Sequence, residues 1–265
     1  MITVSDQTFF RKAVAYYTQN RPYFYAFLRP HELTLFHRVF PSFQRPILDF
    51  GCGDGFFAKF LAEGSPIDYG VDYDPAILPE AQHVYAQVIR SNTTSIPLND
   101  GTVRTIFSNS VFEHLHQPAP MIHELFRILQ SGGKLYTTVT TSAWEEALLG
   151  AKLLGSPYRA WFRKVQRHHA WQSCAAWQTL FVNAGFRVTN TTGYLDVNSV
   201  RKIECYHYLS LPVFFAKMAF GTWNHPLTRL INAPFAALTA PQPLHTTDAA
   251  TAPCVLFELE KSLSS

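Results

Sequence analysis

A short apolar run that leads into a glycine-rich turn constrains the fold of this chain more than any other feature. The run is Pro46–Phe50, and the turn Gly51-Cys52-Gly53-Asp54-Gly55 joins it to a helix-like segment at Phe56–Glu63. Glycine has no Cβ, so a ligand can approach the backbone of such a turn closely. The N-terminus of the following helix adds exposed N–H donors and positive partial charge. The stretch predicts a strand–turn–helix unit that binds a nucleotide-like or carboxylate-bearing ligand.

Strand and helix signals alternate along the chain after this turn. Helical segments begin at Phe56, Ala76 and Pro120, and the last is expected to end at the Ser131-Gly132-Gly133 turn. Such alternation predicts an α/β fold with a parallel sheet covered on both faces. The expected strands between the helices are Ile67–Val71, Val84–Ile89, Thr105–Phe107 and Lys134–Val139.

The flanking segments are expected to be mostly helical. Residues 1–45 are rich in aromatic residues, and Pro22, Pro30 and Pro41 predict two or three short helices there. Residues 195–250 are rich in aromatic residues and proline but lack a clear period. The other expected elements are helices at Ala143–Leu154 and Trp171–Asn183 and late strands at Phe186–Asn190 and Cys254–Leu259.

Composition narrows the class of protein. The 265 residues are 47% hydrophobic and 15% charged, which favours one ordered domain with additions over disorder. Lys plus Arg number 22 and Asp plus Glu 19, without a basic run, so a nucleic-acid partner is not expected. The four cysteines form no CxxC pair and indicate neither a zinc site nor a disulfide framework. We therefore expect a reducing, cytoplasmic location.

The sequence is expected to carry neither a signal peptide nor a membrane span. No basic stretch precedes an apolar run near the N-terminus, and no segment reaches the ~20 apolar residues of a membrane helix. The most apolar segment, residues 208–221, is interrupted by Pro212 and carries Lys217. Two interpretations stay open for it: a packed pair of helices, or a peripheral contact with a membrane surface.

Two residues bear on the ligand of the glycine turn. Asp72 ends the second expected strand, 21 residues after Gly51, where a carboxylate can accept hydrogen bonds from both ribose hydroxyls. The third glycine of a dinucleotide-binding turn is replaced by Phe56. A pyrophosphate would lose close packing there, whereas an adenosyl ligand without phosphates does not need it. An NAD-dependent oxidoreductase is therefore the less favoured alternative.

Five segments in a fixed order give the sequence a specific resemblance. They are LDFGCGDG at 48–55, YGVDYDP at 69–75, SIPL at 95–98, IFSNSVFEHL at 106–115 and ELFRILQSGGKLYTT at 124–138. With them, residues 46–140 resemble class I S-adenosylmethionine-dependent methyltransferases, the broad type that includes ubiquinone and menaquinone methyltransferases. The resemblance implies a Rossmann-like fold with a seven-stranded, mostly parallel sheet, helices on both faces, and S-adenosylmethionine as the cofactor.

The resemblance also implies roles for residues at the first two strand ends. Asp49 and the backbone of Gly51-Cys52-Gly53 would hold the methionine part of the cofactor. Asp72 would bind the ribose, and Tyr73 would lie beside the adenine. Capping or turn formation is the plainer interpretation of Asp49 and Asp72.

Further cofactor contacts are implied at the third and fourth strands. Asn92, followed by Thr93, stands where the family usually has an aspartate that accepts a hydrogen bond from the adenine amine. An amide oxygen can accept the same bond without the charge, which would lower the affinity for the cofactor. Ser108, Asn109 and Ser110 lie where the fourth strand opens over the methyl group.

Histidines are the candidate bases, because their pKa suits proton transfer near neutral pH. His114 and His169 are the best placed, although a surface or packing role explains either as well. Glu113 and His114 are not expected to share a metal ion, because adjacent residues of a helix point about 100° apart. No metal site is therefore predicted.

The acceptor is expected to be a small molecule. A methyl group moves by in-line displacement, and O-methylation is slightly favoured over transfer to nitrogen or carbon. The aromatic residues beyond position 143 favour a hydrophobic or lipid-like acceptor. A cofactor-binding protein that has lost catalysis is the alternative. The expected division is an N-terminal helical cap at 1–45, a cofactor-binding core at 46–194, an acceptor-pocket insertion at 195–253, and a final strand and tail at 254–265.

Overall fold

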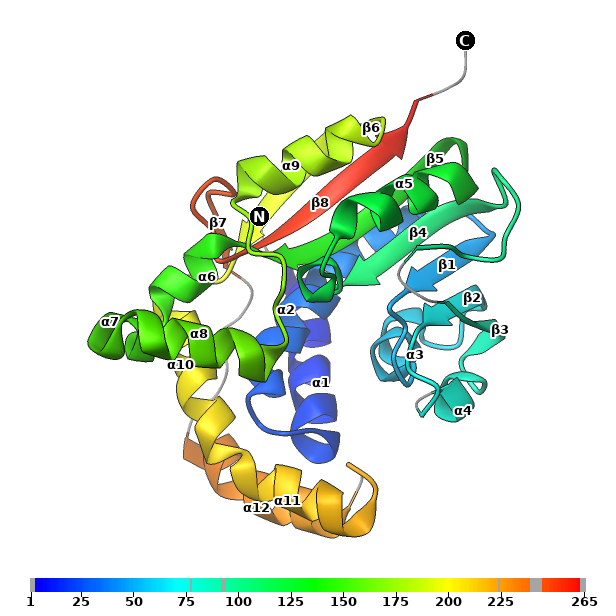
Figure 1. Cartoon of the computed structure of the whole chain (residues 1–265). Helices are drawn as coiled ribbons and strands as arrows, with labels where there is room; N and C mark the ends of the chain where they lie inside the picture. The colour runs from blue at the N-terminus through cyan, green and yellow to red at the C-terminus, as the bar shows by residue number, and fades with distance from the viewer. Residues whose placement is uncertain (1–2, 77, 92–93, 224, 239–244, 263–265) are drawn as a thin grey trace.

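An eight-stranded sheet forms the centre of the molecule (Figure 1). The computed structural model describes residues 3–76, 78–91, 94–223, 225–238 and 245–262. The strand order is β3-β2-β1-β4-β5-β8-β6-β7, in which the first five are parallel and the last three antiparallel to their neighbours. The strands are β1 Ile47–Phe50, β2 Ile67–Asp72, β3 Tyr85–Arg90, β4 Val103–Asn109, β5 Leu129–Thr140, β6 Phe186–Tyr194, β7 Thr246–Thr247 and β8 Cys254–Lys261.

Helices cover both faces of this sheet, which confirms the α/β class. Successive strand residues point to opposite faces, so Leu135 joins the core on one side and Tyr136 the core on the other. Helices α5 (Pro118–Ile128) and α9 (Cys174–Asn183) supply the first core, and α1 (Val4–Asn20), α2 (Tyr25–Val39) and α3 (Phe56–Ala62) supply the second. The two-residue strand β7 makes the sheet one strand larger than predicted.

A helical cap extends from the sheet on the side where the parallel strands end (Figure 1). Residues 195–250 contribute three helices to it despite their lack of a period. Tyr23 stacks on Phe235, and its hydroxyl donates to the Phe235 carbonyl at 3.1 Å, so the N-terminal segment packs against the last helix. The cap helices are α6 Ser142–Ala147, α7 Leu149–Leu154, α8 Ser156–Gln166, α10 Val197–Leu209, α11 Leu211–Phe220 and α12 Pro226–Leu238.

The structure corrects three predicted element boundaries. Pro30 lies inside α2 and does not separate two helices. The expected helix at Ala143–Leu154 divides into α6 and α7, because Leu148 has extended backbone angles. Ser131-Gly132-Gly133 forms an irregularity within β5 where its pairing with β4 shifts, and α5 ends earlier, at Ile128.

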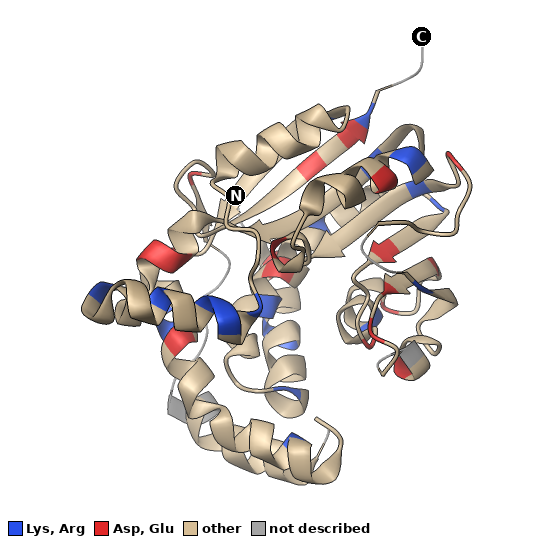
Figure 2. Cartoon of the chain, viewed as in Figure 1, with Lys and Arg blue, Asp and Glu red and all other residues tan. Residues whose placement is uncertain are grey.

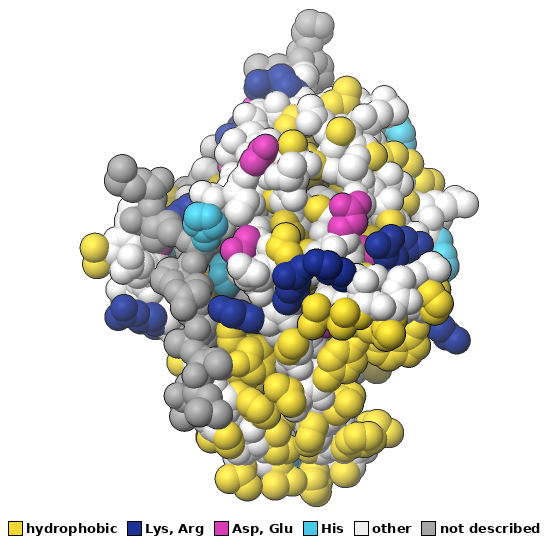
Figure 3. Space-filling view, turned by 90° about the vertical axis from the view of Figure 1, so that its left-hand side faces the viewer, with side chains coloured by type: hydrophobic (Ala, Val, Ile, Leu, Met, Phe, Trp, Pro, Cys, Tyr) yellow, Lys and Arg dark blue, Asp and Glu magenta, His cyan; other side chains and the backbone are white. Residues whose placement is uncertain are grey.

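The surface of the cap is unusually apolar. Helices α11 and α12 carry one basic residue each, Lys217 and Arg229, and no acidic residue (Figure 2). A broad hydrophobic surface covers the lower half of the molecule in the space-filling view (Figure 3). Within the described part of the chain, no helix is both long and apolar enough to cross a membrane.

Candidate active site

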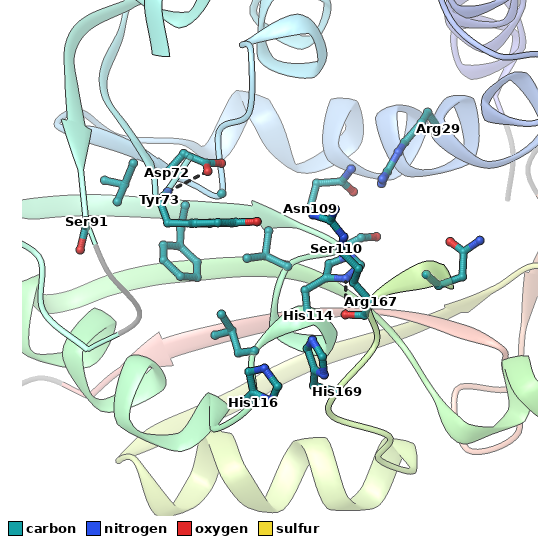
Figure 4. A pocket seen from close by; sticks show the side chains of 16 residues that line it. Arg29, Asp72, Tyr73, Ser91, Asn109, Ser110, His114, His116, Arg167 and His169 are labelled. Atoms are coloured by element: carbon teal, nitrogen blue, oxygen red, sulfur yellow. Dashed lines mark hydrogen bonds between the residues drawn. The ribbon is translucent and has the colours of Figure 1, made fainter. Parts of the chain in front are cut away.

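A cavity of about 550 Å³ lies at the carboxyl ends of β1 to β4 (Figure 4). Ligands of open parallel sheets bind at this edge, because connecting loops meet there above the strand ends. Arg29 of α2 and residues at and after the end of α8 also line the cavity. Its lining comprises Arg29, Phe50, Gly51, Val71, Asp72, Tyr73, Ser91, Asn109, Ser110, Val111, His114, Leu115, His116, Gln166, Arg167 and His169.

The glycine turn is held against the end of β2. The N–H groups of Gly51 and Cys52 both donate to the carbonyl of Val71, at 2.8 and 3.0 Å. Gly51 has a φ of 77°, and a Cβ there would lie 2.2 Å from a methyl group of Val111. A Cβ on Gly53 would meet no described atom within 4 Å, so the turn leaves open space beside this residue. The geometry is that of a backbone cradle.

Asp72 links the two strand ends. One carboxylate oxygen accepts a hydrogen bond from the Gly53 N–H at 2.9 Å, and the other accepts from the N–H groups of Tyr73 and Asp74 at 2.7 and 3.1 Å. The carboxylate therefore stands beside the glycine turn at the cavity wall, as the sequence predicts. The ring of Tyr73 also lines the cavity and is 62% exposed.

Asp49 lies beneath the turn and does not line the cavity. Its carboxyl group is buried and accepts a hydrogen bond from the Tyr85 hydroxyl at 2.6 Å. Burial raises the pKa of Asp49 to about 7, and the negative charge of Asp72 adds to the increase. The Asp49 carboxyl group therefore gains or loses its proton near neutral pH in the folded chain.

Asp49 should make the unfolding free energy fall as the pH rises from about 4 to about 7, against the opposite trend that the lowered pKa of His168 produces over much of the same range. Over that range Asp49 is protonated in the folded chain and ionised in the unfolded chain, whose pKa is near 3.8. Its stabilising contribution is complete below the unfolded pKa and is lost as the pH passes the folded pKa. Asp49→Asn should remove this contribution, so the unfolding free energy of the parent should fall relative to that of the variant between pH 4 and 7, measured by urea unfolding. Identical profiles for variant and parent would contradict the assignment.

Phe56, in place of a third glycine, serves contacts with the N-terminal segment. Its ring stacks on Tyr16 with 4.1 Å between ring centroids, and the Arg21 guanidinium lies 3.7 Å from its centroid. Arg21 also forms an ion pair with Asp54 of the turn. Phe56, at the position where a dinucleotide-binding turn has glycine, thus fixes α1 to the start of α3.

A buried carboxylate that sequence reasoning missed stands behind the cavity wall. Glu32 of α2 is fully buried, and its oxygens accept hydrogen bonds from Arg29 at 2.6 Å, Ser110 at 2.9 Å, Asn109 at 3.1 Å and the Tyr194 hydroxyl at 3.3 Å. Three of these partners, Arg29, Asn109 and Ser110, line the cavity. Glu32 therefore fixes the end of β4 against α2.

The other predicted cofactor residues divide between cavity wall and core. Asn109 lines the cavity, whereas the Ser108 hydroxyl is buried and has no hydrogen-bond partner among the described residues. Cys52 is buried, and burial raises the pKa of its thiol, which argues against a nucleophilic role. Asn92 and Thr93 lie outside the described residues.

Histidines from two segments meet at the cavity. His114 and His116 follow β4, and His169 follows α8. The rings of His116 and His169 stack with centroids 3.6 Å apart, and the Nδ1 atom of His114 lies 3.2 Å from the carbonyl of Arg167. Desolvation lowers the pKa of His169, and the charges of the neighbouring His116 and His114 lower it further. Both predicted bases therefore line the cavity.

A sequence match covers most of the residues that line this site, although Arg29, Gln166, Arg167 and His169 lie outside it. Residues 48–137 match the family model described as a methyltransferase domain. A probable S-adenosylmethionine-dependent methyltransferase of Mycolicibacterium smegmatis is 28% identical over 182 residues, 68% of this chain and 66% of the relative. Another of the same description, from Mycobacterium tuberculosis, is 30% identical over 110 residues, 40% of each chain. The chain thus matches 66% or less of the length of these relatives.

The fold is shared with solved structures. A structure from Thermotoga maritima, described as an S-adenosylmethionine-dependent methyltransferase and possible histamine N-methyltransferase, aligns over 90% of this chain and 93% of its own length. The TM-score is 0.56 and the sequence identity 15%, so the similarity concerns the fold alone. Residues 48–137 are thus similar in sequence to a methyltransferase domain, and the chain shares the fold of class I S-adenosylmethionine-dependent methyltransferases.

Proposed function

We propose that this chain transfers the methyl group of S-adenosylmethionine to a small-molecule acceptor in the cavity at the ends of β1 to β4. The observation that carries the proposal is the Asp72 carboxylate, which is hydrogen-bonded to Gly53 of the glycine turn and exposed to that cavity. A ribose-binding acid beside a backbone cradle fits an adenosyl ligand without phosphates. Phe56 stands where a dinucleotide-binding turn has its third glycine, and its ring contacts Tyr16 and Arg21 of the N-terminal segment.

The residues of the cradle fit the cofactor. Asp72 would accept hydrogen bonds from the ribose hydroxyls, with Tyr73 beside the adenine. Gly51-Cys52-Gly53 would approach the methionine part through the backbone, with Asp49 as an acidic group beneath them. Asn92, Thr93 and Asn109 are the remaining proposed contacts, whereas the burial of Ser108 in the core argues against its predicted contact. When bound, the cofactor supplies an electrophilic methyl group on a sulfonium.

The acceptor side of the proposal concerns the histidines and the cap. Displacement at a sulfonium methyl requires alignment of the acceptor atom and exclusion of water, which residues 1–45 and 195–253 would provide as caps. A hydroxyl acceptor also requires a base, and His169 or His114 at the cavity wall would take its proton. We propose O-methylation on this ground, with an acceptor whose apolar part contacts Phe50, Val111 and Leu115.

The test begins with binding and ends with transfer. S-adenosylhomocysteine at about 100 times its Kd should raise the melting temperature by several degrees, whereas NAD should not. The chain should then transfer label from methyl-labelled S-adenosylmethionine to a component of a metabolite extract. A response to NAD alone would overturn the proposal in favour of an oxidoreductase. Cofactor binding without transfer to any extract component would favour a protein that has lost catalysis.

The apolar cap supports a second proposal, a peripheral membrane contact through residues 208–221 that would bring a lipid-like acceptor to the cavity. Phe215 is 66% exposed and Met218 is 81% exposed, so burial in the core does not explain why these residues are apolar. Other exposed apolar residues of α11 and of the adjoining helices α10 and α12 are Leu209, Leu211, Phe220, Leu227 and Leu230.

The chain should sediment with vesicles of zwitterionic lipid. Phe215→Ser combined with Met218→Ser should reduce the fraction of protein bound to the vesicles several-fold. Burial of apolar side chains in the bilayer interface would be lost in this double variant. Val182→Ser is the matched control, since Val182 is 50% exposed on α9, outside the cap. A chain that stays in the supernatant, or a control that loses as much binding as the double variant, would contradict the contact.

A further inference from the structure

Three side chains able to bind a metal ion meet beside the cavity. Glu113 and His114 belong to the short 3₁₀ helix η2 (Phe112–His114), and His168 lies in the segment after α8. One potential ligand atom from each of the three lies within 4.8 Å of the others. The tight turn of η2 and the arrival of His168 from a distant segment bring together groups that an α-helical spacing would hold apart.

Two of these groups carry polar atoms without a partner. The Oε1 atom of Glu113 accepts hydrogen bonds from the N–H and hydroxyl of Thr140, both at 3.2 Å, whereas its Oε2 atom is buried and accepts none from the described residues. The Nδ1 atom of His168 is likewise buried without a partner among them. Glu113 itself is only 1% exposed. A buried, unsatisfied carboxylate oxygen is costly unless a cation or donor pairs with it.

The scaffold around the three side chains is fixed. The N–H groups of His169 and Ala170 donate to the carbonyl of Glu113 at 2.8 and 3.1 Å, which holds the His168 segment against η2. The Nδ1 atom of His114 lies 3.2 Å from the Arg167 carbonyl. A proton on Nδ1 would donate to that carbonyl and leave Nε2 as the ligand atom, the usual arrangement around metal-bound histidine.

We propose that Glu113, His114 and His168 bind a divalent transition-metal ion, with Zn²⁺ as the ion best suited to two imidazoles and one carboxylate. This donor set, with a fourth position left open, is that of catalytic zinc sites. Zinc–ligand bonds of about 2.1 Å would place tetrahedral ligand atoms about 3.4 Å apart, so side-chain movements on the order of 1 Å would complete the site.

The site adjoins the cavity, because His114 is also a lining residue. A metal ion there would polarise an acceptor hydroxyl and lower its pKa. With His114 engaged as a ligand, His169 is the histidine left to act as base. The proposal goes beyond the proposed methyl transfer, and metal binding can be measured without any cofactor or acceptor.

The experiment measures Zn²⁺ affinity by competition with a chromophoric chelator, on protein purified without a polyhistidine tag. One Zn²⁺ per chain should bind, and His168→Ala should weaken binding by more than the roughly 10- to 100-fold that loss of an outer hydrogen-bond partner costs. Glu113→Gln and His114→Ala should act in the same direction. Co²⁺ should give the visible d–d absorption of a low-coordinate site in the parent chain but not in these three variants.

His116→Ala is the control, because His116 lines the same cavity but belongs to the stacked pair with His169. It should keep the parent affinity. Thermal melts with and without Zn²⁺ give a second readout, since only a chain that binds the ion is stabilised by it. No binding by the parent chain at micromolar Zn²⁺, binding unchanged in His168→Ala, or loss of binding in His116→Ala would each overturn the proposal.

Discussion

Asp72→Ala should lower the affinity for S-adenosylhomocysteine by at least about 100-fold while the chain remains folded. Two hydrogen bonds from ribose hydroxyls to a carboxylate are worth about 1.5–3 kcal/mol each, so their loss costs about 3 kcal/mol or more. The fold should survive, because the side chain bonds only to the glycine turn and to its own loop. Calorimetric titration gives the affinity, and circular dichroism checks the fold.

Asp74→Ala is the matched control for this measurement. Asp74 lies in the same loop and accepts a hydrogen bond from the N–H of Ala76, but it does not line the cavity. Its removal should leave the affinity within a few-fold of the parent value. Equal affinities for Asp72→Ala and the parent chain would refute the ribose assignment, and with it the observation on which the proposed function rests.

Glu32→Ala should lower the unfolding free energy by about 3–5 kcal/mol, the usual cost of removing one partner of a buried ion pair. The Arg29 guanidinium would lose its carboxylate, and the hydroxyls of Ser110 and Tyr194 would lose their acceptor. Urea unfolding at neutral pH measures the change. Glu32→Gln retains an acceptor oxygen and should lose less stability than the alanine variant.

The control for Glu32 is Glu146→Ala, on α6, whose side chain is exposed. Surface substitutions of this kind usually change stability by no more than about 0.5 kcal/mol. A loss below about 1 kcal/mol in Glu32→Ala would mean that the four contacts around this carboxylate do not act as a structural unit. In that case the end of β4 would be held by sheet hydrogen bonds alone.

The sequence was sufficient to predict the glycine turn and Asp72. Both depend on local features: a buried apolar run defines each strand, and the carboxyl ends of neighbouring parallel strands meet at one edge of the sheet. The register Asp49↔Gly70 and Phe50↔Val71 then places the residue after β1 beside the residue that ends β2. Short-range pattern and sheet geometry together were enough for this half of the site.

The other half depends on contacts that no local pattern reveals. Glu32 lies 78 residues from Ser110 and 162 residues from Tyr194, and its helix contains a proline that favours a break. Similarly, α11 is apolar on most sides and lacks the alternation that marks a helix packed on one face. The contact between His168 and Glu113 could not be predicted for the same reason, because it depends on the path of the chain between α8 and α9.

The cap is assembled from both ends of the chain. The side-chain amide of Asn232, on the last helix, donates to the carbonyls of Thr18 and Arg21 at 2.7 and 2.8 Å. During synthesis, the first helices therefore lack these partners until α12 has been made. A nascent chain that stops short of α12 lacks Phe235, so the face of the Tyr23 ring that stacks on it is left uncovered.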